Sequence, residues 1–543
     1  MKKCIRIILS LFLLVSFCGC ANSTPETSQE TPKQDAGEDT TVYPEAESKQ
    51  LSSFYESVRE EKDWGTLIDF HNNKTAPEAF RRYRDFSNRF LLSAINRGEN
   101  EFVSPLSFYY AMAMLANGAS GDTRAKIENA LGMNVDDLNA FLSDLDVSYE
   151  NDYGVPFLKA NALWFNTHHG LSLKQSFKDT ITQYYGQCIG EYDFGDGSGL
   201  SKTVNAWASE KTKGGINDLV FDSDFDEDTS FLILNALLSG DKWSFPFDAA
   251  ETKLQEFHTY NGETKMCEMM HQELWGHWSD DLSQGFAKML DNSVMVSAIL
   301  PNEGVDVYDY LNQMTSDTLI PYAVMDTGYG NIEEKADYSC IADYHYTDLA
   351  FPKFTIEKEY DLSQSLKKLG LSELFSDSTC DLSNMAQGDP ATVAMLYVDQ
   401  VKQKAQLKVD EKEVVASAVT IVMGGLGAAG CDERQTYHHE VIFDRPFIIA
   451  LTARSSDTLL PLFIGVVADL GEDASGAIRI ENITGKINIR KEPSASAERV
   501  GTYQKGEVVY AYETKEAEGY TWYRIGEGKW VADKGGEWIK VLD

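Results

Sequence analysis

Histidine and carboxylate side chains near the end of the chain are the first candidates for chemistry, and their spacing does not indicate an enzyme site. His438 and His439 stand together, and Asp444 follows them. A hydrolytic triad needs a nucleophile on a sharp turn, and a metal centre needs ligands at characteristic spacing. Neither accompanies these residues. We therefore expect surface or packing histidines, no metal, no cofactor and no catalytic residue.

Cysteine is the second reactive residue type. Beyond the first 20 residues the cysteines are odd in number and widely spaced, which does not suit a disulfide framework: Cys188, Cys267, Cys340, Cys380 and Cys431. Most are expected to be buried small hydrophobes. Cys431 ends a glycine-rich stretch, so we expect its thiol on an exposed loop where it could react.

That glycine-rich stretch follows a run of strand-forming residues. Residues 409–423 are rich in Val, Ile, Thr and Ala and predict one long β-strand, whereas residues 424–431 carry clustered glycines that resist a paired backbone. An ordinary hairpin with a flexible tip is one interpretation. The other is a strand that joins its sheet only when it is triggered.

Length and charge restrict the classes of protein. The 543 residues suit one large domain with one or two small pieces, and the 43% hydrophobic content is ample for a large core. The formal net charge is −37, from 85 acidic and 48 basic residues. Nucleic-acid binding is not expected, because contact with phosphates needs clustered Lys and Arg.

The N-terminus predicts export. Lys2, Lys3 and Arg6 accompany an apolar run that ends at Phe17, which is typical of a secretory signal and too short for a stable membrane span. Gly19 before Cys20 is similar to a bacterial lipoprotein processing site, with Cys20 as the lipidated residue. A plain cleaved signal is the alternative. We expect residues 1–20 to be the signal peptide, 21–50 a disordered tether and 51–77 an N-terminal extension.

Residues from 80 onward alternate between helical and strand patterns. An amphipathic helix is predicted over residues 80–96, and a nearly continuous apolar helix over residues 108–118 must be buried. Residues 232–238 and 293–300 are apolar on both faces, as central strands are.

Several motifs follow one another over residues 78–470. They are Phe102-Val103-Ser104-Pro105-Leu106-Ser107 with residues 116–119, residues 204–216, Asn235-Ala236-Leu237 with Trp243 and Pro246-Phe247, residues 349–356, residues 381–385, and Phe443-Asp444-Arg445-Pro446-Phe447. In their sequence and in their order, these motifs resemble the serpin family.

The resemblance implies an α+β serpin fold of about three β-sheets and eight to nine helices, with an exposed reactive loop. It also implies an irreversible suicide-substrate inhibitor and not an enzyme. A protease cleaves the loop and becomes covalently attached, and the loop then inserts as an extra strand in the main sheet. Insertion of about a dozen residues would add about a dozen hydrogen bonds, each contributing about 0.5–1.5 kcal/mol.

The resemblance also assigns site residues. The hinge of the loop comprises Glu413, Val414, Val415, Ala416, Ser417, Ala418, Val419 and Thr420, which from Val414 onward are small or β-branched and uncharged. The region where the sheet opens comprises Ser104, Ser107, Asn235, Trp243 and Gln403. Glu413 stands where inhibitory members carry Gly, and Val414 where they carry Thr or Ser. Gln403 replaces a family histidine, and we expect it to bridge to Ser104, Ser107 or Asn235.

The expected cleavage site is centred on Leu426, Gly427 and Ala428, and any bond from residue 423 to 431 stays open. No Lys or Arg occurs in that stretch, which argues against trypsin-like targets. Elastase-like or subtilisin-like serine proteases, or papain-like cysteine proteases, are the expected partners. A noninhibitory serpin that acts as a binding or scaffold protein is the alternative. The protein is expected to be a monomer, lipid-anchored at the outer face of a bacterial cell membrane.

The end of the chain predicts a separate module. Residues 471–477 read as a linker, and residues 478–543 as short alternating strands of a small all-β barrel. Their order resembles bacterial Src-homology-3-like domains, which implies binding of cell-wall peptides. Exposed aromatics at Tyr510, Tyr512, Tyr520 and Trp538 would do this, or they fill a small core. A wall-binding adhesin is therefore a further alternative.

Overall fold

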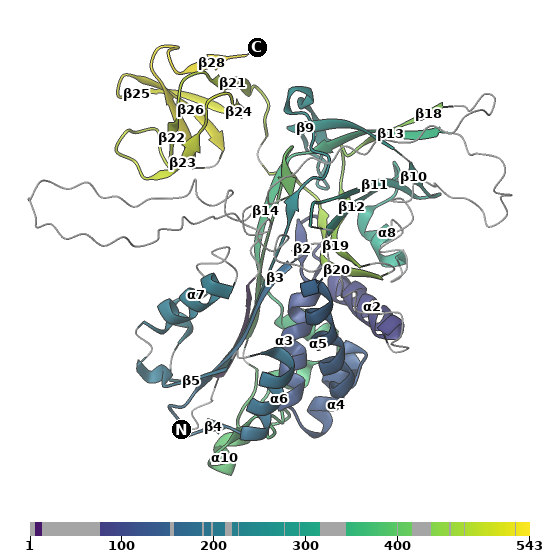
Figure 1. Ribbon diagram of the computed structural model, residues 1–543, viewed down its shortest axis with the longest axis vertical. Helices are drawn as coiled ribbons and strands as arrows, with labels where there is room; N and C mark the ends of the chain where they lie inside the picture. Colours follow the sequence, from purple (N-terminus) through teal and green to yellow (C-terminus); the bar gives the residue numbers. More distant parts are fainter. Residues whose placement is uncertain are drawn as a thin grey trace, which may run out of the picture.

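The computed structural model describes residues 6–12, 76–151, 157–186, 189–196, 199–211, 220–225, 227–275, 277–292, 294–314, 344–398, 400–414, 436–455, 458–471, 473–526 and 528–542. Within them lie three large β-sheets and nine α-helices, together with a separate β-module at the C-terminus (Figure 1). The expected combination of several sheets with eight to nine helices is confirmed.

The main sheet has six strands in the order β14-β16-β1-β6-β3-β5. Their bounds are Phe354–Asp361, Gln400–Val409, Arg6–Phe12, Thr229–Ser239, Phe157–Asn166 and Ile189–Tyr192, in that order. β6 is the predicted central strand, and its residues 231–234 are fully buried because both faces are covered.

Two further sheets complete the large domain. One has the order β10-β11-β12-β19-β20-β2, with bounds Trp278–Ser279, Ser283–Met289, Val294–Pro301, Phe447–Ser455, Thr458–Val467 and Glu101–Val103. The other has the order β18-β13-β9-β8, with bounds Thr436–Ile442, Tyr344–Pro352, Thr264–Trp275 and Lys253–His258. Two small pairs join β15 (Ala386–Gln387) to β4 (Ser172–Leu173), and β17 (Glu413–Val414) to β7 (Asp241–Lys242).

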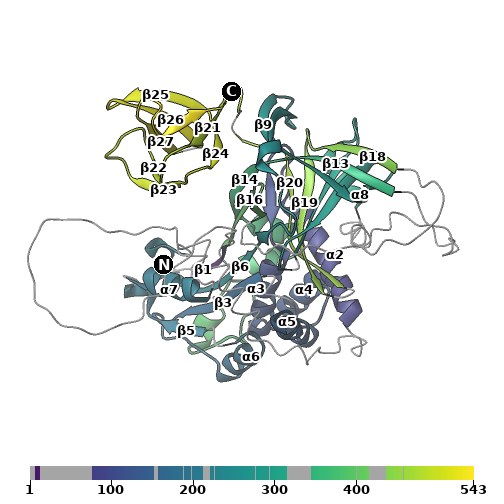
Figure 2. The same cartoon turned by 45° about the horizontal axis from the view of Figure 1, so that its top comes forward.

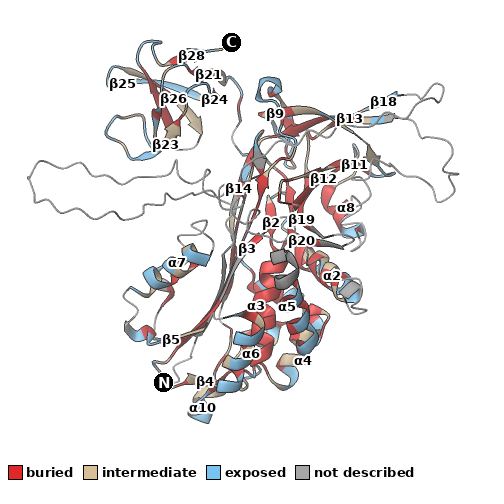
Figure 3. Ribbon diagram, in the orientation of Figure 1, coloured by how far each residue is buried: buried red, intermediate tan, exposed pale blue. Residues whose placement is uncertain are grey.

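Helices α2 to α6 gather on one side of the main sheet, with α3 among them, whereas α7 lies on the other side (Figure 3). The helix bounds are α2 Ala76–Ala94, α3 Pro105–Gly118, α4 Gly121–Leu131, α5 Val135–Asn151, α6 Gln175–Tyr185, α7 Leu200–Lys211, α8 Val307–Gln313, α9 Ser363–Lys368 and α10 Pro390–Val393. Every residue of α3 is buried, as its apolar sequence predicts, and Ser104 caps its N-terminus by accepting a hydrogen bond from the Ser107 amide. The predicted helix over residues 80–96 begins and ends slightly earlier, as α2.

Strand β1 lies between β16 and β6 and runs parallel to both. Leu11 is the partner of Gln403 on one side and of Asn235 on the other. These residues belong to the predicted signal peptide, so the structure shows that the space between β6 and β16 accepts an additional strand.

The C-terminal module forms a three-stranded sheet, β24-β21-β28, and a five-stranded sheet, β23-β22-β27-β26-β25. The bounds are β21 Ile478–Asn482, β22 Ile487–Arg490, β23 Arg499–Tyr503, β24 Val508–Ala511, β25 Glu513–Ala517, β26 Tyr520–Gly526, β27 Lys529–Asp533 and β28 Ile539–Val541. The module has its own core around Ile480, Tyr503 and Val531. Among the described helices of the whole chain, none has the length and apolar character needed to cross a membrane.

Candidate functional site

The candidate site begins where β16 ends. The predicted single strand over residues 409–423 is wrong in its described part, because β16 stops at Val409 and the chain bends over residues 410–412. Two residues then pair antiparallel with β7, Glu413 with Lys242 and Val414 with Asp241. Val414 is fully buried. We call residues 410–414 the hinge segment.

Trp243 and Phe247 hold the backbone of the hinge segment. The Trp243 amide donates to the Lys412 carbonyl at 3.2 Å, and its indole Nε1 donates to the Asp410 carbonyl at 2.9 Å. The Phe247 amide donates to the Glu411 carbonyl at 2.9 Å. Three consecutive carbonyls are therefore satisfied by one short segment after β7, which fixes the path of the chain before the loop.

A network of charged side chains reinforces this arrangement. Lys353 Nζ lies 2.6 Å from Glu268 Oε2 and 3.2 Å from Glu411 Oε1, and the Glu411 oxygen also accepts a hydrogen bond from Thr252 Oγ1 at 2.8 Å. Burial by itself lowers the pKa of Lys353, but the two carboxylates outweigh it and hold this pKa above its ordinary value. The hinge segment is thus tied to β9, and to the residue that joins β13 to β14, through ionic contacts that are largely removed from solvent.

Beside this network lies a buried lysine that no sequence motif singles out. Lys288 Nζ sits 5.4 Å from the centre of the Trp243 ring and 5.0 Å from that of Phe247, and it donates to Gln272 Oε1 at 2.6 Å and to the Phe245 carbonyl. Burial lowers its pKa to about 7. The two aromatic faces stabilise the ammonium form in part.

The predicted sheet-opening residues divide into three groups. Gln403 is fully buried and bonds to the Ser104 backbone twice, because its Nε2 donates to the carbonyl at 3.2 Å and its Oε1 accepts from the amide at 3.3 Å. Ser107 bonds to the Ser104 hydroxyl, which itself donates to the Leu462 carbonyl at 2.7 Å. Asn235 lies on β6, separated from β16 by β1, and Trp243 belongs to the hinge contacts described above.

Several predicted positions lie outside the described residues. These are the lipidation residue Cys20, the hinge residues Val415, Ala416, Ser417, Ala418, Val419 and Thr420, and the cleavage-site residues Leu426, Gly427 and Ala428. Of Glu413, only the backbone pairing with β7 is described.

Several histidines gather in and beside the third sheet, whereas His168 and His169 follow β3. His439 stacks on His277 with ring centres 3.8 Å apart, and its Nε2 is 2.9 Å from His345 Nδ1. On the other side of β18, His438 meets Glu273 and Asp348, whose ligand atoms lie within 4.8 Å of one another and could hold a metal ion. All three are exposed. Sequence spacing could not show this cluster, because its members come from three different strands.

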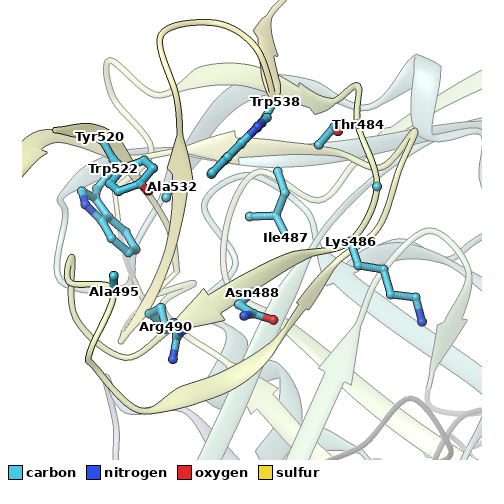
Figure 4. A pocket seen from close by; sticks show the side chains of 11 residues that line it. Thr484, Lys486, Ile487, Asn488, Arg490, Ala495, Tyr520, Trp522, Ala532 and Trp538 are labelled. Carbon is cyan, nitrogen blue, oxygen red and sulfur yellow. The ribbon is translucent and has the colours of Figure 1, made fainter. Parts of the chain in front are cut away.

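The C-terminal module has a cleft of about 400 Å³ (Figure 4). Its walls include Tyr520, Trp522 and Trp538, with Lys486 and Arg490 beside them. The rings of Tyr520 and Trp538 are 5.7 Å apart. Of the four aromatics, Tyr510 is buried, as the core-filling alternative predicts, and Tyr512, Tyr520 and Trp538 are partly buried.

Comparison with known proteins covers the large domain. The serpin (serine protease inhibitor) family profile matches residues 81–470. Kallistatin of Pongo abelii is 29% identical over 399 residues, which span 71% of this chain and 86% of that protein. The leukocyte elastase inhibitor of Bos taurus is 27% identical over 385 residues, spanning 69% and 94%. Among solved structures, the thermophilic serpin tengpin in its native state is 26% identical with a TM-score of 0.59, covering 75% of this chain and 96% of that one.

Proposed function

Since the chain belongs to the serpin (serine protease inhibitor) family, and similar members include the leukocyte elastase inhibitor of Bos taurus, we propose that it traps extracellular proteases irreversibly. The nucleophile of the protease attacks a carbonyl in the loop, the peptide bond breaks, and an acyl-enzyme ester or thioester forms. Insertion of the freed strand into the main sheet then carries the protease away before water can hydrolyse that bond.

The observation that carries this proposal is the position of the hinge segment. It continues directly from β16, the strand on one side of the space that β1 fills. β16 and β6 both run parallel to β1, so they run parallel to each other. A segment that folds back from the hinge into that space would therefore be antiparallel to both neighbours and could pair with both.

The proposed targets follow from residues 423–431. They contain no cation for the specificity pocket of a trypsin-like enzyme, and small apolar residues dominate. The name of the similar leukocyte elastase inhibitor agrees with an elastase-like target. Subtilisin-like and papain-like proteases share this preference for small apolar residues.

Incubation with elastase and with trypsin tests the proposal. On a denaturing gel we expect a high-mass covalent band with elastase and none with trypsin. Val419→Pro, which removes a backbone donor from the inserting strand, should be cleaved by elastase without forming the band. Cleavage of the unaltered protein without a high-mass band would show that it is a substrate and not an inhibitor.

A noninhibitory binding or scaffold role is the second candidate, because Glu413 lacks the backbone freedom of Gly at the pivot. The melting temperature after cleavage of the loop distinguishes the inhibitory from the noninhibitory role. A loop that inserts after cleavage should raise the melting temperature sharply, whereas a loop that stays outside the sheet should leave it nearly unchanged.

Display at the cell surface is part of the proposal. Lipid on Cys20 would anchor the chain, since each buried methylene contributes about 0.8 kcal/mol, and residues 21–50 would act as the tether. Fatty-acid labelling in a bacterial host should mark the protein and should be lost in Cys20→Ser. Labelling that survives this change would contradict the assignment.

We also propose that the C-terminal module is a Src-homology-3-like barrel that binds cell-wall peptide in its cleft. The adjoining Tyr520 and Trp538 rings offer apolar contact, and Lys486 and Arg490 offer charge for a peptide carboxylate. Purified peptidoglycan should retain the whole protein, and the Trp538→Ala variant should not be retained. Absence of retention would leave the module as a spacer or a structural part of the inhibitor.

A further inference from the structure

The C-terminal module reaches the network that holds the hinge segment. Tyr512, directly after β24, donates its phenol hydrogen to Glu268 Oε1 at 3.0 Å. Glu268 lies on β9, and its other oxygen, Oε2, is the one that binds Lys353. Figure 2 shows the module beside the ends of β9 and β14. One carboxylate is therefore shared between the module and the large domain.

From Glu268 the polar contacts continue to the hinge segment. Lys353 bridges Glu268 to Glu411, which belongs to the hinge segment and whose carbonyl accepts a hydrogen bond from the Phe247 amide. The side chains of Glu268 and Glu411 are only 11% and 12% exposed, so water screens these contacts weakly. The path from Tyr512 to the hinge segment thus consists of three successive polar contacts.

Two features keep Tyr512 in place. The predicted linker is fixed to β9: the Ala474 amide donates to the Met266 carbonyl at 2.8 Å, and Asp473 Oδ1 accepts from the Met266 amide at 2.8 Å. Met266 lies two residues before Glu268 on the same strand. Inside the module, the Arg524 guanidinium lies 5.9 Å from the centre of the Tyr512 ring.

A second point of approach agrees with this docking. Burial lowers the pKa of Lys529 in the module, and repulsion from the Lys408 ammonium lowers it further. Lys408 belongs to β16, the strand that leads into the hinge segment. Two separate parts of the module therefore face the region where the loop begins.

We propose that the C-terminal module braces the hinge: Tyr512 orients Glu268, which orients Lys353 against Glu411, so that docking of the module limits how often the hinge segment opens. Tyr512 is a positioning residue in this scheme, because it acts on the hinge segment through Glu268 and Lys353. The consequence for inhibition rests on the proposed function, but the opening of the hinge does not.

Hydrogen exchange of the full chain tests the brace without any protease. The amides of Trp243 and Phe247 donate to hinge carbonyls, so their exchange reports opening of the hinge segment. In Tyr512→Phe we expect exchange at these amides to rise about threefold to tenfold, as for the loss of one ordinary hydrogen bond. Tyr192→Phe, the same change on β5, is the matched control and should leave both amides unchanged.

A double-mutant cycle shows whether Tyr512 acts through Glu268. Glu268→Gln should increase exchange at the same amides, and adding Tyr512→Phe to it should increase exchange little further. Equal exchange in the unaltered protein and Tyr512→Phe would overturn the brace, as would independent, additive effects of the two changes. Amides of β24 and β26 monitor the module itself, and a loss of protection there in Tyr512→Phe equal to that at the hinge would also overturn it.

The two proposals fail in different ways. If the protein forms no covalent band with elastase but the cycle shows coupling, the brace stands and the inhibitor assignment falls. If the covalent band forms but Tyr512→Phe leaves exchange at the Trp243 and Phe247 amides unchanged, the inhibitor assignment stands and the brace falls.

Discussion

At the scale of single residues, Lys353 joins more parts of the candidate site than any residue that the sequence motifs singled out. It touches two carboxylates from two different segments, and its side chain is 23% exposed. Removal of one member of a buried ionic network leaves the others charged and unpaired, which usually costs more than the network contributes.

We predict that Lys353→Met lowers the free energy of unfolding of the large domain by about 3 kcal/mol, because Glu268 and Glu411 lose their shared counter-ion. Urea unfolding measures this loss. Lys253→Met is the matched control: its side chain is 59% exposed and pairs only with exposed Glu251, so the change should stay within about 0.5 kcal/mol. Equal effects of the two variants would contradict the importance of the network.

At the scale of elements, apolar patterning predicted α3, β6 and β12 because burial on both faces leaves a continuous signal in the sequence. Apolar patterning did not predict the break at residues 410–412, although Asp410 is a turn former whose carboxylate accepts a hydrogen bond from the Lys412 amide. The hydrogen bonds that Trp243 donates to this bent backbone come from far away in sequence and leave no local signal. Gln403 was expected near Ser104 from the family resemblance. Lys288 and Tyr512 had no local signal, because their roles depend on which elements meet.

Strand β18, the first strand described after the loop, lies at the edge of the third sheet, where its partner among the described strands is β13. Stacked imidazoles of His277, His345 and His439 line that edge. The pKa of His277 is lowered to about 4, mainly by burial and further by the neighbouring imidazoles of His439 and His345. Burial and His345 also lower the pKa of His439, while the facing carboxylate of Asp348 raises it.

We predict that β18 is held less firmly at acid pH. Below pH 6.5 a detached, solvated histidine gains a proton before the stacked one does, so protonation favours detachment as the pH falls toward about 4. Protection factors of the β18 amides at pH 7.5 and pH 5 measure this. His277→Gln should reduce the pH dependence, and His258→Gln, on β8, should not. Greater protection of β18 at pH 5 would show that the sign is wrong.

At the scale of the whole molecule, the family motifs predicted the large domain and a separate small module, but not how the two meet. Residues 471–477 look like a free linker because Gly, Asp and Ser dominate them. In the structure that segment is bonded to β9, and Tyr510 is buried beside Arg479 instead of facing a ligand. Docking surfaces of this kind carry no periodicity, so sequence patterns do not reveal them.

The occupied space between β6 and β16 has a consequence for when the protein becomes able to act. If residues 1–19 are removed so that the mature chain begins at Cys20, as proposed, the precursor has a complete main sheet and the mature chain lacks the strand over residues 6–12. The precursor should then melt at a higher temperature than the chain that begins at residue 20, and it should form no covalent band with elastase. Equal melting temperatures would show that the leader adds nothing to the sheet. Removal of the leader, and not synthesis of the chain, would open the space between β6 and β16 into which the cleaved loop inserts. A chain that still carries its leader inside the cell would therefore be inactive toward proteases there.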